Sequence, residues 1–197
     1  ELRCQHAAAA VGVAPAPLCL NNHQRMLVSE FLTRSRHFDW QLHHGELMQL
    51  VEKLVRLHRL TVQTPELQPL LYLQQLYDDL PEHNRGQLPQ DIFAVLQQAA
   101  GEFMQLPTDI VLCHMDLHSG NILLQQQRIW LIDFEYCQLA DSSFDLAALS
   151  INLGMSSSEE SKMLLYYLEH REQAAAALGA FGGLDAMADL PVDHRLP

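Results

Sequence analysis

Two stretches of sequence decide the fold: HMDLHSGN at residues 114–121 and WLIDFEY at residues 130–136. They place an acid, Asp116, an amide, Asn121, and a second acid, Asp133, in a fixed order. Phosphoryl transfer from a magnesium-bound nucleotide needs such a set, because one carboxylate orients a hydroxyl while an Asn and an Asp hold the metal. The apolar run at 129–132 predicts a short buried strand, and a strand end is a rigid platform for a metal ligand.

The spacing within the first stretch predicts a tight loop and not a helix. Asp116 and Asn121 are separated by a segment that contains Ser119 and Gly120. In such a loop Asp116 can accept a hydrogen bond from a substrate hydroxyl while Asn121 turns toward a metal. Asp133, from the neighbouring strand, would complete the oxygen ligands that Mg²⁺ prefers. The set therefore predicts phosphoryl transfer, which depends mostly on alignment and charge neutralisation.

The composition fits a chain with one sizeable core. Of 197 residues, 48% are hydrophobic and 18% are charged, which excludes a chain dominated by disorder. The 12 Lys and Arg against 24 Asp and Glu give a formal charge of −12, which argues against a nucleic-acid partner. An acidic surface suits a cationic small substrate, although solubility explains it equally well.

The cysteines and the apolar runs bear on the compartment. The four cysteines are scattered without CxxC spacing, so neither a zinc site nor a disulfide framework is expected. No apolar run approaches the roughly 18 residues that a membrane helix needs. The first five residues, ELRCQ, lack the basic-then-apolar order of a signal peptide. We therefore expect a cytoplasmic protein that has no membrane partner, and the oligomeric state stays open.

The first half of the chain predicts a small sheet followed by helices. Residues 1–10 are Ala-rich and predict a helix that ends before Gly12 and two prolines. Residues 17–20 and 26–32 predict two strands around a polar turn. Apolar residues spaced by three and four predict an amphipathic helix at 45–60. Looser patterns predict helices at 70–80 and 91–104, joined by a linker at 81–89.

The second half begins with short apolar runs at 109–113 and 121–124, then a polar turn and the strand at 129–132. Residues 141–152 predict a helix that Ser142 or Ser143 caps. Its buried face would consist of Phe144, Leu146, Ala147 and Leu149. A capping box at 156–160 predicts a further helix to about residue 177, and residues 179–197 are expected to be irregular.

These motifs resemble those of the aminoglycoside phosphotransferase and choline kinase superfamily. The resemblance rests on His114-x-Asp116-x-x-x-x-Asn121, on Ile132-Asp133-Phe-Glu-Tyr136 and on Asp141-x-x-x-Asp145-Leu-Ala. The second motif is most similar to bacterial choline/ethanolamine kinase-like and thiamine kinase-like proteins. The resemblance implies an α+β, protein-kinase-like fold. Residues 1–33 would be the remnant of the N-terminal nucleotide lobe with the hinge, and residues 34–197 a mostly helical C-terminal catalytic lobe.

The resemblance also implies roles for individual residues. Asp116 would be the catalytic base, and Asn121 and Asp133 would be the ligands of Mg²⁺. His114 and Asp145 would support the catalytic loop. The hinge that meets the adenine of ATP would consist of Ser29, Glu30, Phe31 and Leu32. Glu1 would lie where the early helix of the family carries the Glu that pairs with a phosphate-binding Lys.

The start of the chain departs from the family pattern. Family members place a nucleotide-covering loop and a Lys-bearing strand before this helix, and this chain begins at the helix. Its only lysines, Lys53 and Lys162, lie in predicted helices and cannot replace that Lys. The sequence leaves open whether the chain is a piece of a complete kinase or a truncated relative with impaired activity.

Several residues near the motifs admit two interpretations. His114, Asp116 and His118 alternate as the ligands of metal hydrolases sometimes do, but His118 fits better as a loop residue near the substrate. Glu135 either contacts a metal or a cationic substrate, or is an exposed strand-end residue. Tyr136 is the best aromatic candidate for a cation–π contact with the substrate.

Other aromatic residues are expected to serve the core more than the substrate. Trp40 is a second candidate for a cation–π contact, and Trp130, in the predicted strand, is expected in the core. Cys113 and Cys137 flank the motifs and are interpreted as small hydrophobic residues.

The sequence as a whole predicts an ATP-dependent kinase that phosphorylates a hydroxyl of a small alcohol. The expected substrate is cationic or bears an amine: thiamine, choline or ethanolamine first, an aminoglycoside or another metabolite second. The alternative is a non-catalytic, kinase-like binding protein that retains a ligand pocket. A metallohydrolase is the third hypothesis.

Overall fold

An amphipathic helix, α2 (Leu47–His58), lies at the centre of the molecule. The computed structural model describes residues 2–21, 26–41 and 43–180. Apolar residues spaced by three and four put Leu50, Leu54 and Leu57 on one face of α2, where each is fully buried. Burying a leucine side chain stabilises a fold by roughly 1.5–3 kcal/mol. This face packs against α7, β4 and β6, so α2 is the helix around which the core forms.

Two small antiparallel sheets carry the two sequence motifs at 114–121 and 130–136. β4 (Ile110–Cys113) pairs with β7 (Gln138–Asp141), and β5 (Ile122–Gln125) pairs with β6 (Arg128–Leu131). β3 (Arg36–His37) adds a third strand beside β5. Residues 114–121, which include the single turn η2 (Ser119–Asn121), connect β4 to β5. The first motif therefore bridges the two sheets.

The N-terminal part consists of α1 (Leu2–Ala10) and a hairpin of β1 (Pro17–Asn21) and β2 (Met26–Ser29). Gly12 follows α1 with a φ of +70°, a left-handed conformation that glycine adopts without strain and that commonly ends helices. The hairpin is the outermost part of this region and exposes Leu18, Met26 and Val28.

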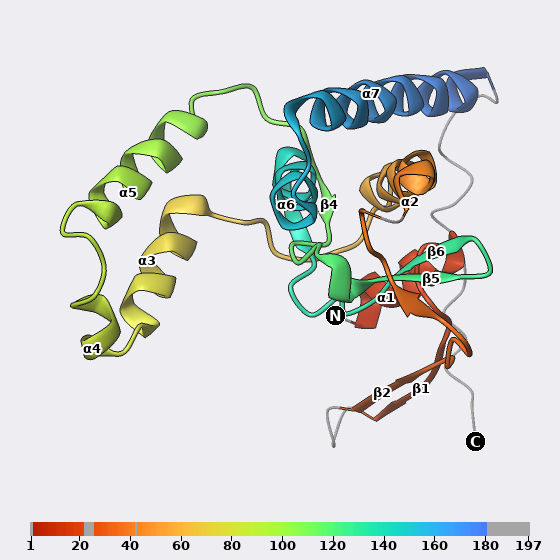
Figure 1. Ribbon diagram of the computed structural model, residues 1–197, viewed down its shortest axis with the longest axis horizontal. Helices are drawn as coiled ribbons and strands as arrows, with labels where there is room; N and C mark the ends of the chain where they lie inside the picture. Colours follow the sequence, from red (N-terminus) through yellow and green to blue (C-terminus); the bar gives the residue numbers. More distant parts are fainter. Residues whose placement is uncertain (1, 22–25, 42, 181–197) are drawn as a thin grey trace.

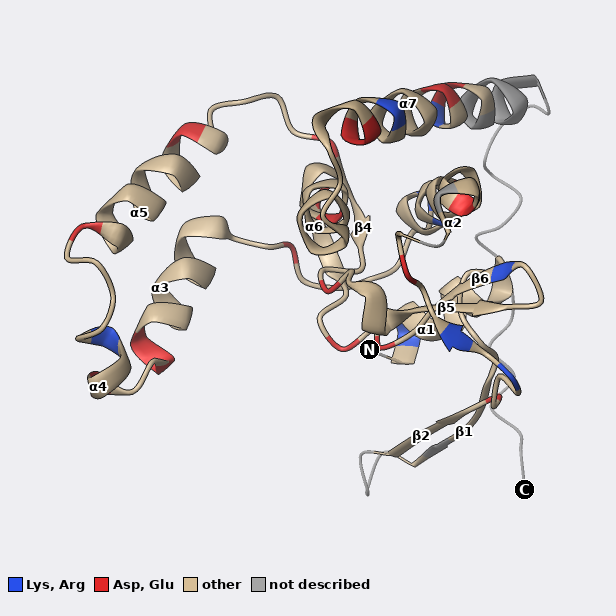
Figure 2. Cartoon of the chain, in the orientation of Figure 1, with Lys and Arg blue, Asp and Glu red and all other residues tan. Residues whose placement is uncertain are grey.

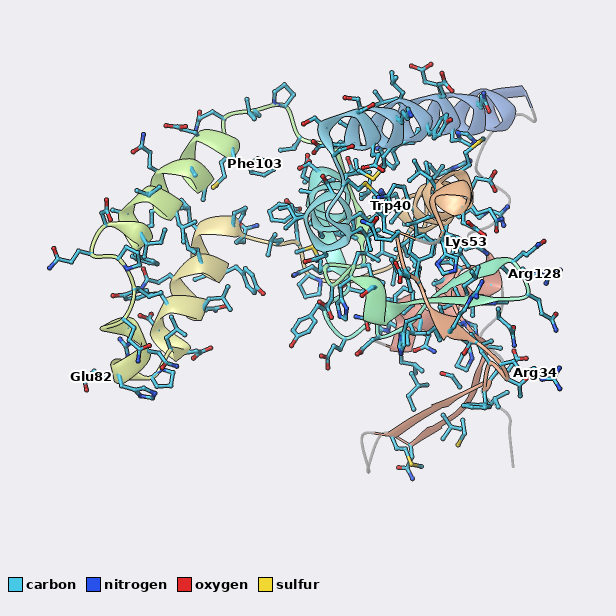
Figure 3. All side chains as sticks on the ribbon, viewed as in Figure 1. Arg34, Trp40, Lys53, Glu82, Phe103 and Arg128 are labelled. Carbon is cyan, nitrogen blue, oxygen red and sulfur yellow. The ribbon has the colours of Figure 1, made fainter. Side chains whose placement is uncertain are left out.

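Three helices form an arm that extends away from the rest of the molecule (Figure 1). They are α3 (Pro69–Asp79), α4 (Glu82–Arg85) and α5 (Ile92–Phe103), and none of their residues is buried. Within the arm Tyr77 stacks on Phe93 with ring centroids 4.1 Å apart. Figure 3 shows Glu82 at the far end of the arm and Phe103 nearer the body. Phe103 makes an edge-to-face contact with Phe144, with ring centroids 5.5 Å apart.

The last two helices cover the body. α6 (Ser143–Leu153) ends at Gly154, which has a φ of 64°, and α7 (Ser157–Ala180) runs along α2. The predicted capping box of α7 is confirmed, because the Ser156 backbone N–H donates to Glu159 at 2.7 Å and the Glu159 N–H donates to Ser156 Oγ. A further single turn, η1 (His44–Glu46), precedes α2. Among the described helices, none has the length and apolarity needed to span a bilayer.

Most elements agree with the sequence prediction, and several details differ. The second predicted strand ends at Ser29, before residues 30–32, and α7 extends to Ala180. Ser142 is the N-cap residue of α6, as predicted, but its side chain makes no capping hydrogen bond; the Asp141 carboxylate instead accepts the Ser143 N–H at 3.0 Å. On α6, Leu146 and Leu149 are buried as expected, but Ala147 is exposed. The linker at 81–89 contains α4, and β3 and β7 were not predicted.

Glu1 and the tail at 181–197 lie outside the described residues, so the predictions for them stay predictions. The division of the chain at residue 33 into two lobes also stays a prediction.

Candidate active site

The loop after β4 is held in place by one buried carboxylate. Asp145, on the first turn of α6, is fully buried, and its two oxygens accept the backbone N–H groups of His114 and Met115 at 2.8 and 2.9 Å. Met115 has a φ of 69°, an uncommon backbone conformation for a residue other than glycine. The two hydrogen bonds that Asp145 accepts fix this turn, and the supporting role of Asp145 in catalysis stays a prediction.

Within the loop, Asp116 and Asn121 contact each other directly. Asn121 Nδ2 donates to the Asp116 carboxylate at 2.8 Å and to the Asp116 backbone carbonyl at 3.0 Å. Because the amide nitrogen is committed to Asp116, the amide oxygen of Asn121 remains as an acceptor or metal ligand. Asn121 is buried, while Asp116 is half-buried and can reach a substrate.

His118 and Gly120 shape the same loop. The Gly120 N–H donates to His118 Nδ1 at 3.0 Å, and His118 Nε2 lies 3.7 Å from the Asp116 carboxylate. A Cβ on residue 120 would lie only 2.6 Å from the His118 ring, so this close approach requires glycine. His118 is thus a loop residue next to Asp116.

Asp133 is brought to the loop by the backbone of Ile132. The Ile132 N–H donates to the Asn121 carbonyl at 3.0 Å, and the Ile132 carbonyl accepts from His114 Nε2 at 2.9 Å. Asp133 follows with a φ of 66° and an exposed side chain, while Phe134 is fully buried. A left-handed conformation costs a residue with a side chain about 1–2 kcal/mol. The buried contacts on both sides hold Asp133 in this conformation.

His114 lies among the carboxylates of the site. Because a carbonyl only accepts, His114 carries its hydrogen on Nε2, and its Nδ1 is buried with no hydrogen-bond partner among the described residues. Burial lowers the pKa of His114, although the charges of Asp145, Asp116 and Asp133 act in the opposite direction. His114 thus holds the segment before Asp133 through Ile132, and its role in catalysis stays a prediction.

A buried polar chain that the sequence analysis missed lies behind Asp145. His58, the last residue of α2, contacts the Asp145 carboxylate through Nε2 at 3.0 Å and the Tyr167 hydroxyl through Nδ1 at 2.6 Å. Arg171 donates to the same hydroxyl at 3.2 Å and pairs with Asp109. His58 follows Leu54 by one helical turn, so a polar residue on the apolar face of α2 was the available signal.

The predicted hinge residues differ in exposure. Ser29 Oγ accepts from Gln5 of α1 at 2.6 Å, and the Glu30 N–H donates to the Ala16 carbonyl at 2.8 Å. Leu32 is buried, whereas Phe31 is 85% exposed. These contacts place the segment beside α1, and its contact with adenine stays a prediction.

The predicted substrate residues are not all in one place. Glu135 and Tyr136 are exposed just beyond Asp133, and the charges of Glu135 and Asp116 raise the pKa of Tyr136. Tyr72, at the start of the arm, contributes the smallest part of this rise in the pKa of Tyr136.

Trp40 lies elsewhere and is only 4% exposed; it lines a pocket of about 410 Å³ that also includes Ser119. Figure 3 shows it beside α2. Trp130 was expected in the core, but its ring is only half-buried. The centre of the ring lies 5.3 Å from Lys53 Nζ.

The donors of the site suit a hard divalent cation. The amide oxygen of Asn121 and the carboxylate of Asp133 are oxygen ligands of the kind that Mg²⁺ prefers. The metallohydrolase hypothesis finds less support, because His114 is buried and its Nε2 is committed to Ile132. Cys113 is also inert, because burial and the charges of Asp145 and Asp141 raise the pKa of its thiol.

Comparison with known proteins places these motifs in a family. The profile described as "Phosphotransferase enzyme family" matches residues 1–195 of the chain. Protein LicA of Haemophilus influenzae is 44% identical over 50 residues, which are 24% of this chain and 15% of that protein. A 3-deoxy-D-manno-octulosonic acid kinase of H. influenzae strain 86-028NP is 37% identical over 68 residues, which are 28% of each chain.

Solved structures show the same fold. A choline/ethanolamine kinase family protein from Mesorhizobium loti superimposes with a TM-score of 0.70 at 20% identity, over 86% of this chain and 59% of that one. Choline kinase LicA from Streptococcus pneumoniae also gives a TM-score of 0.70, at 22% identity, over 82% of this chain and 58% of that one.

The chain thus spans less than two thirds of the length of these relatives. The predicted resemblance and the α+β, protein-kinase-like fold are confirmed. With its profile match over nearly the whole sequence, the chain belongs to the phosphotransferase enzyme family.

Proposed function

We propose that this protein transfers the terminal phosphoryl group of ATP to the hydroxyl of a small alcohol, with Mg²⁺ as cofactor. The observation that carries the proposal is the contact between Asp116 and Asn121, with Asp133 held beside them through Ile132. This arrangement puts a candidate proton acceptor next to two oxygen ligands, as phosphoryl transfer requires.

Each residue has a separate task in this proposal. Asp116 accepts the proton of the substrate hydroxyl and aligns its oxygen for attack, while the Asn121 amide holds the carboxylate in position. Asn121 and Asp133 would hold Mg²⁺, which supplies neutralisation of the phosphate charge when bound. His114 and Asp145 keep the backbone of both motifs fixed and contact neither substrate.

The finer proposal concerns the substrate. Glu135, Tyr136 and Asp116 present two carboxylates and an exposed aromatic ring, which together favour a cationic alcohol. Relatives include proteins described as choline kinase LicA and an ethanolamine kinase of Plasmodium vivax. We therefore propose choline, ethanolamine or thiamine as the first substrates to test, ahead of aminoglycosides.

The nucleotide and the location belong to the same proposal. A LicA structure contains AMP and an amicoumacin kinase structure contains AMP-PNP, which supports a nucleotide site that includes the hinge Ser29 to Leu32. We propose that residues 1–33 form part of the nucleotide lobe and residues 34–197 the catalytic lobe. Because ATP is the donor, we propose that the protein works in the cytoplasm.

The test measures ADP formation from ATP and Mg²⁺ in the presence of each alcohol. Asp116→Asn should lower the turnover by at least about 100-fold, since general base catalysis contributes that much or more. The matched control is Glu169→Gln, which neutralises one exposed carboxylate on α7 and should leave turnover unchanged.

Two results would contradict the proposal. Normal turnover in Asp116→Asn would remove Asp116 from catalysis. If no alcohol stimulates ADP formation while choline or another alcohol still binds in calorimetry, the protein is a binding protein and not an enzyme.

A further inference from the structure

A second pocket lies on the body and has a different lining from the candidate active site. It has a volume of about 290 Å³ and lies between α2, the turn after α1 and the β5–β6 hairpin. Its lining consists of Gly12, Gln49, Glu52, Lys53, Arg56, Arg128 and Trp130. Asp116, Asn121 and Asp133 do not line it, so this pocket is distinct from the phosphoryl-transfer motifs.

Positive charge converges on this pocket in a chain whose formal charge is −12. Three of its lining residues, Lys53, Arg56 and Arg128, are cationic, and only Glu52 is anionic, which leaves an excess of two positive charges. Figure 3 shows Lys53 next to α2 and Arg128 at the turn of the β5–β6 hairpin, and Figure 2 shows that basic residues gather in this part of the molecule. Like charges placed together repel each other, so the cluster favours a bound anion.

Two of the three cations, Lys53 and Arg56, are held in place by contacts with the backbone, an aromatic ring and Glu52. Lys53 donates to the Gly12 carbonyl, and its ammonium lies 5.3 Å from the centre of the Trp130 ring. Arg56 donates to the Val11 carbonyl at 3.5 Å and lies 3.9 Å from Glu52. Because an ammonium has three donors and a guanidinium five, both side chains keep donors for a ligand.

The electrostatic surroundings of Lys53 would favour a bound anion. Burial lowers the pKa of Lys53, and the charges of Arg56 and Arg128 lower it further, against the opposite effect of Glu52. An anion between these groups would offset their repulsion and restore the charged form of the lysine.

We propose that this pocket binds a small phosphate dianion, either inorganic phosphate or the phosphate group of a monoester. The excess of two positive charges matches a dianion, and the planar forks of Arg56 and Arg128 match its oxygens. This site is independent of the proposed kinase activity.

The experiment uses Trp130 as its reporter. In a Trp40→Phe variant, Trp130 is the only tryptophan of the chain, and its fluorescence is followed during titration with potassium phosphate at constant ionic strength. EDTA keeps divalent cations away from the carboxylates of the other site. We expect a saturable change, and calorimetry on the unmodified chain should give the same affinity.

Two variants separate the pocket from general charge effects. Arg128→Gln should bind at least about tenfold more weakly, because it removes a charged hydrogen-bond donor that faces the phosphate. Arg34→Gln removes one exposed cation elsewhere and should bind as the parent does. Binding of glycerol phosphate would show that the site accepts esters, whereas binding of inorganic phosphate alone would restrict it to the free ion.

The proposal is overturned by either of two outcomes. One is the absence of a saturable signal in both fluorescence and calorimetry. The other is an equal response of Arg128→Gln and Arg34→Gln, or an equal response to potassium chloride, since each would show ionic screening and no site.

Discussion

The body and the arm of this protein are built in opposite ways. In the body, polar groups around the motifs are buried and hydrogen-bonded, as Asp145 and His58 show. In the arm, α3, α4 and α5 contain no buried residue and are joined chiefly by the contact of α3 with α5. The apolar side chains of the arm line an open pocket of about 370 Å³, which includes Leu73, Leu76 and Phe93.

The difference in burial between body and arm matches two requirements of the proposed enzyme, rigid catalytic groups and an adaptable substrate-binding region. Catalytic groups must be held within fractions of an ångström, which needs buried and paired supports. Regions that recognise a substrate are drawn from the less stable parts of a fold, because they have to adapt. We therefore propose that the body carries the chemistry and that the arm carries part of the specificity.

The largest effect is expected from Asp145→Asn. The change keeps the shape but removes the charge that His58 and two backbone N–H groups contact, so unfolding free energy should fall by about 3–5 kcal/mol. The measurement is urea unfolding followed by circular dichroism.

The same variant predicts a pH dependence. Burial alone would raise the pKa of Asp145, but the hydrogen bond and the charge of His58, with help from His114, hold it below its ordinary value. A carboxylate with a lowered pKa contributes stability above its unfolded pKa and loses it as the pH falls through the folded pKa. The difference between parent and variant should therefore narrow below about pH 4, and a difference that grows in acid would contradict this account.

The next largest effect on stability is expected from replacing a leucine of the body, and it can be compared with the same change in the arm. Leu54→Ala, in α2, should lower the free energy of unfolding by about 2–5 kcal/mol, because the side chain is fully buried. Leu76→Ala, in α3, should change it by less than about 0.5 kcal/mol, because the side chain is 49% exposed. Equal losses in thermal or urea unfolding would show that the arm is packed as tightly as the body in solution.

The smallest effect concerns helix ends. Ser156→Ala removes the capping box of α7 and should cost about 1 kcal/mol. The helices of the arm, all within the described residues, start without a side-chain cap, so Gln68→Ser should stabilise α3 by a similar amount. Hydrogen exchange of the amides at 69–79 would report the gain. Unchanged exchange in Gln68→Ser would mean that the end of α3 does not limit its stability.

The sequence predicted the motifs and the amphipathic helix because their signals are local. Asp116, Asn121 and Asp133 stand at recognisable spacings, and the apolar spacing of α2 predicts its buried face. β3 and β7 were missed because strands of two and four residues are defined by their partners and not by their own composition. His58 and Tyr167 were missed for the same reason, since the hydrogen bond that relates them spans 109 residues.

The position of Asp145 late in the sequence also affects when the candidate site can form during synthesis. The backbone N–H groups that donate to Asp145 belong to His114 and Met115, which precede it by 31 and 30 positions. His58 precedes it by 87 positions. A nascent chain that has emerged only to Tyr136 therefore contains Asp116, Asn121 and Asp133 but not the group that fixes their loop. The three motif residues are therefore synthesised before Asp145, which fixes their loop. We expect the site to form late, when α6 packs against the body.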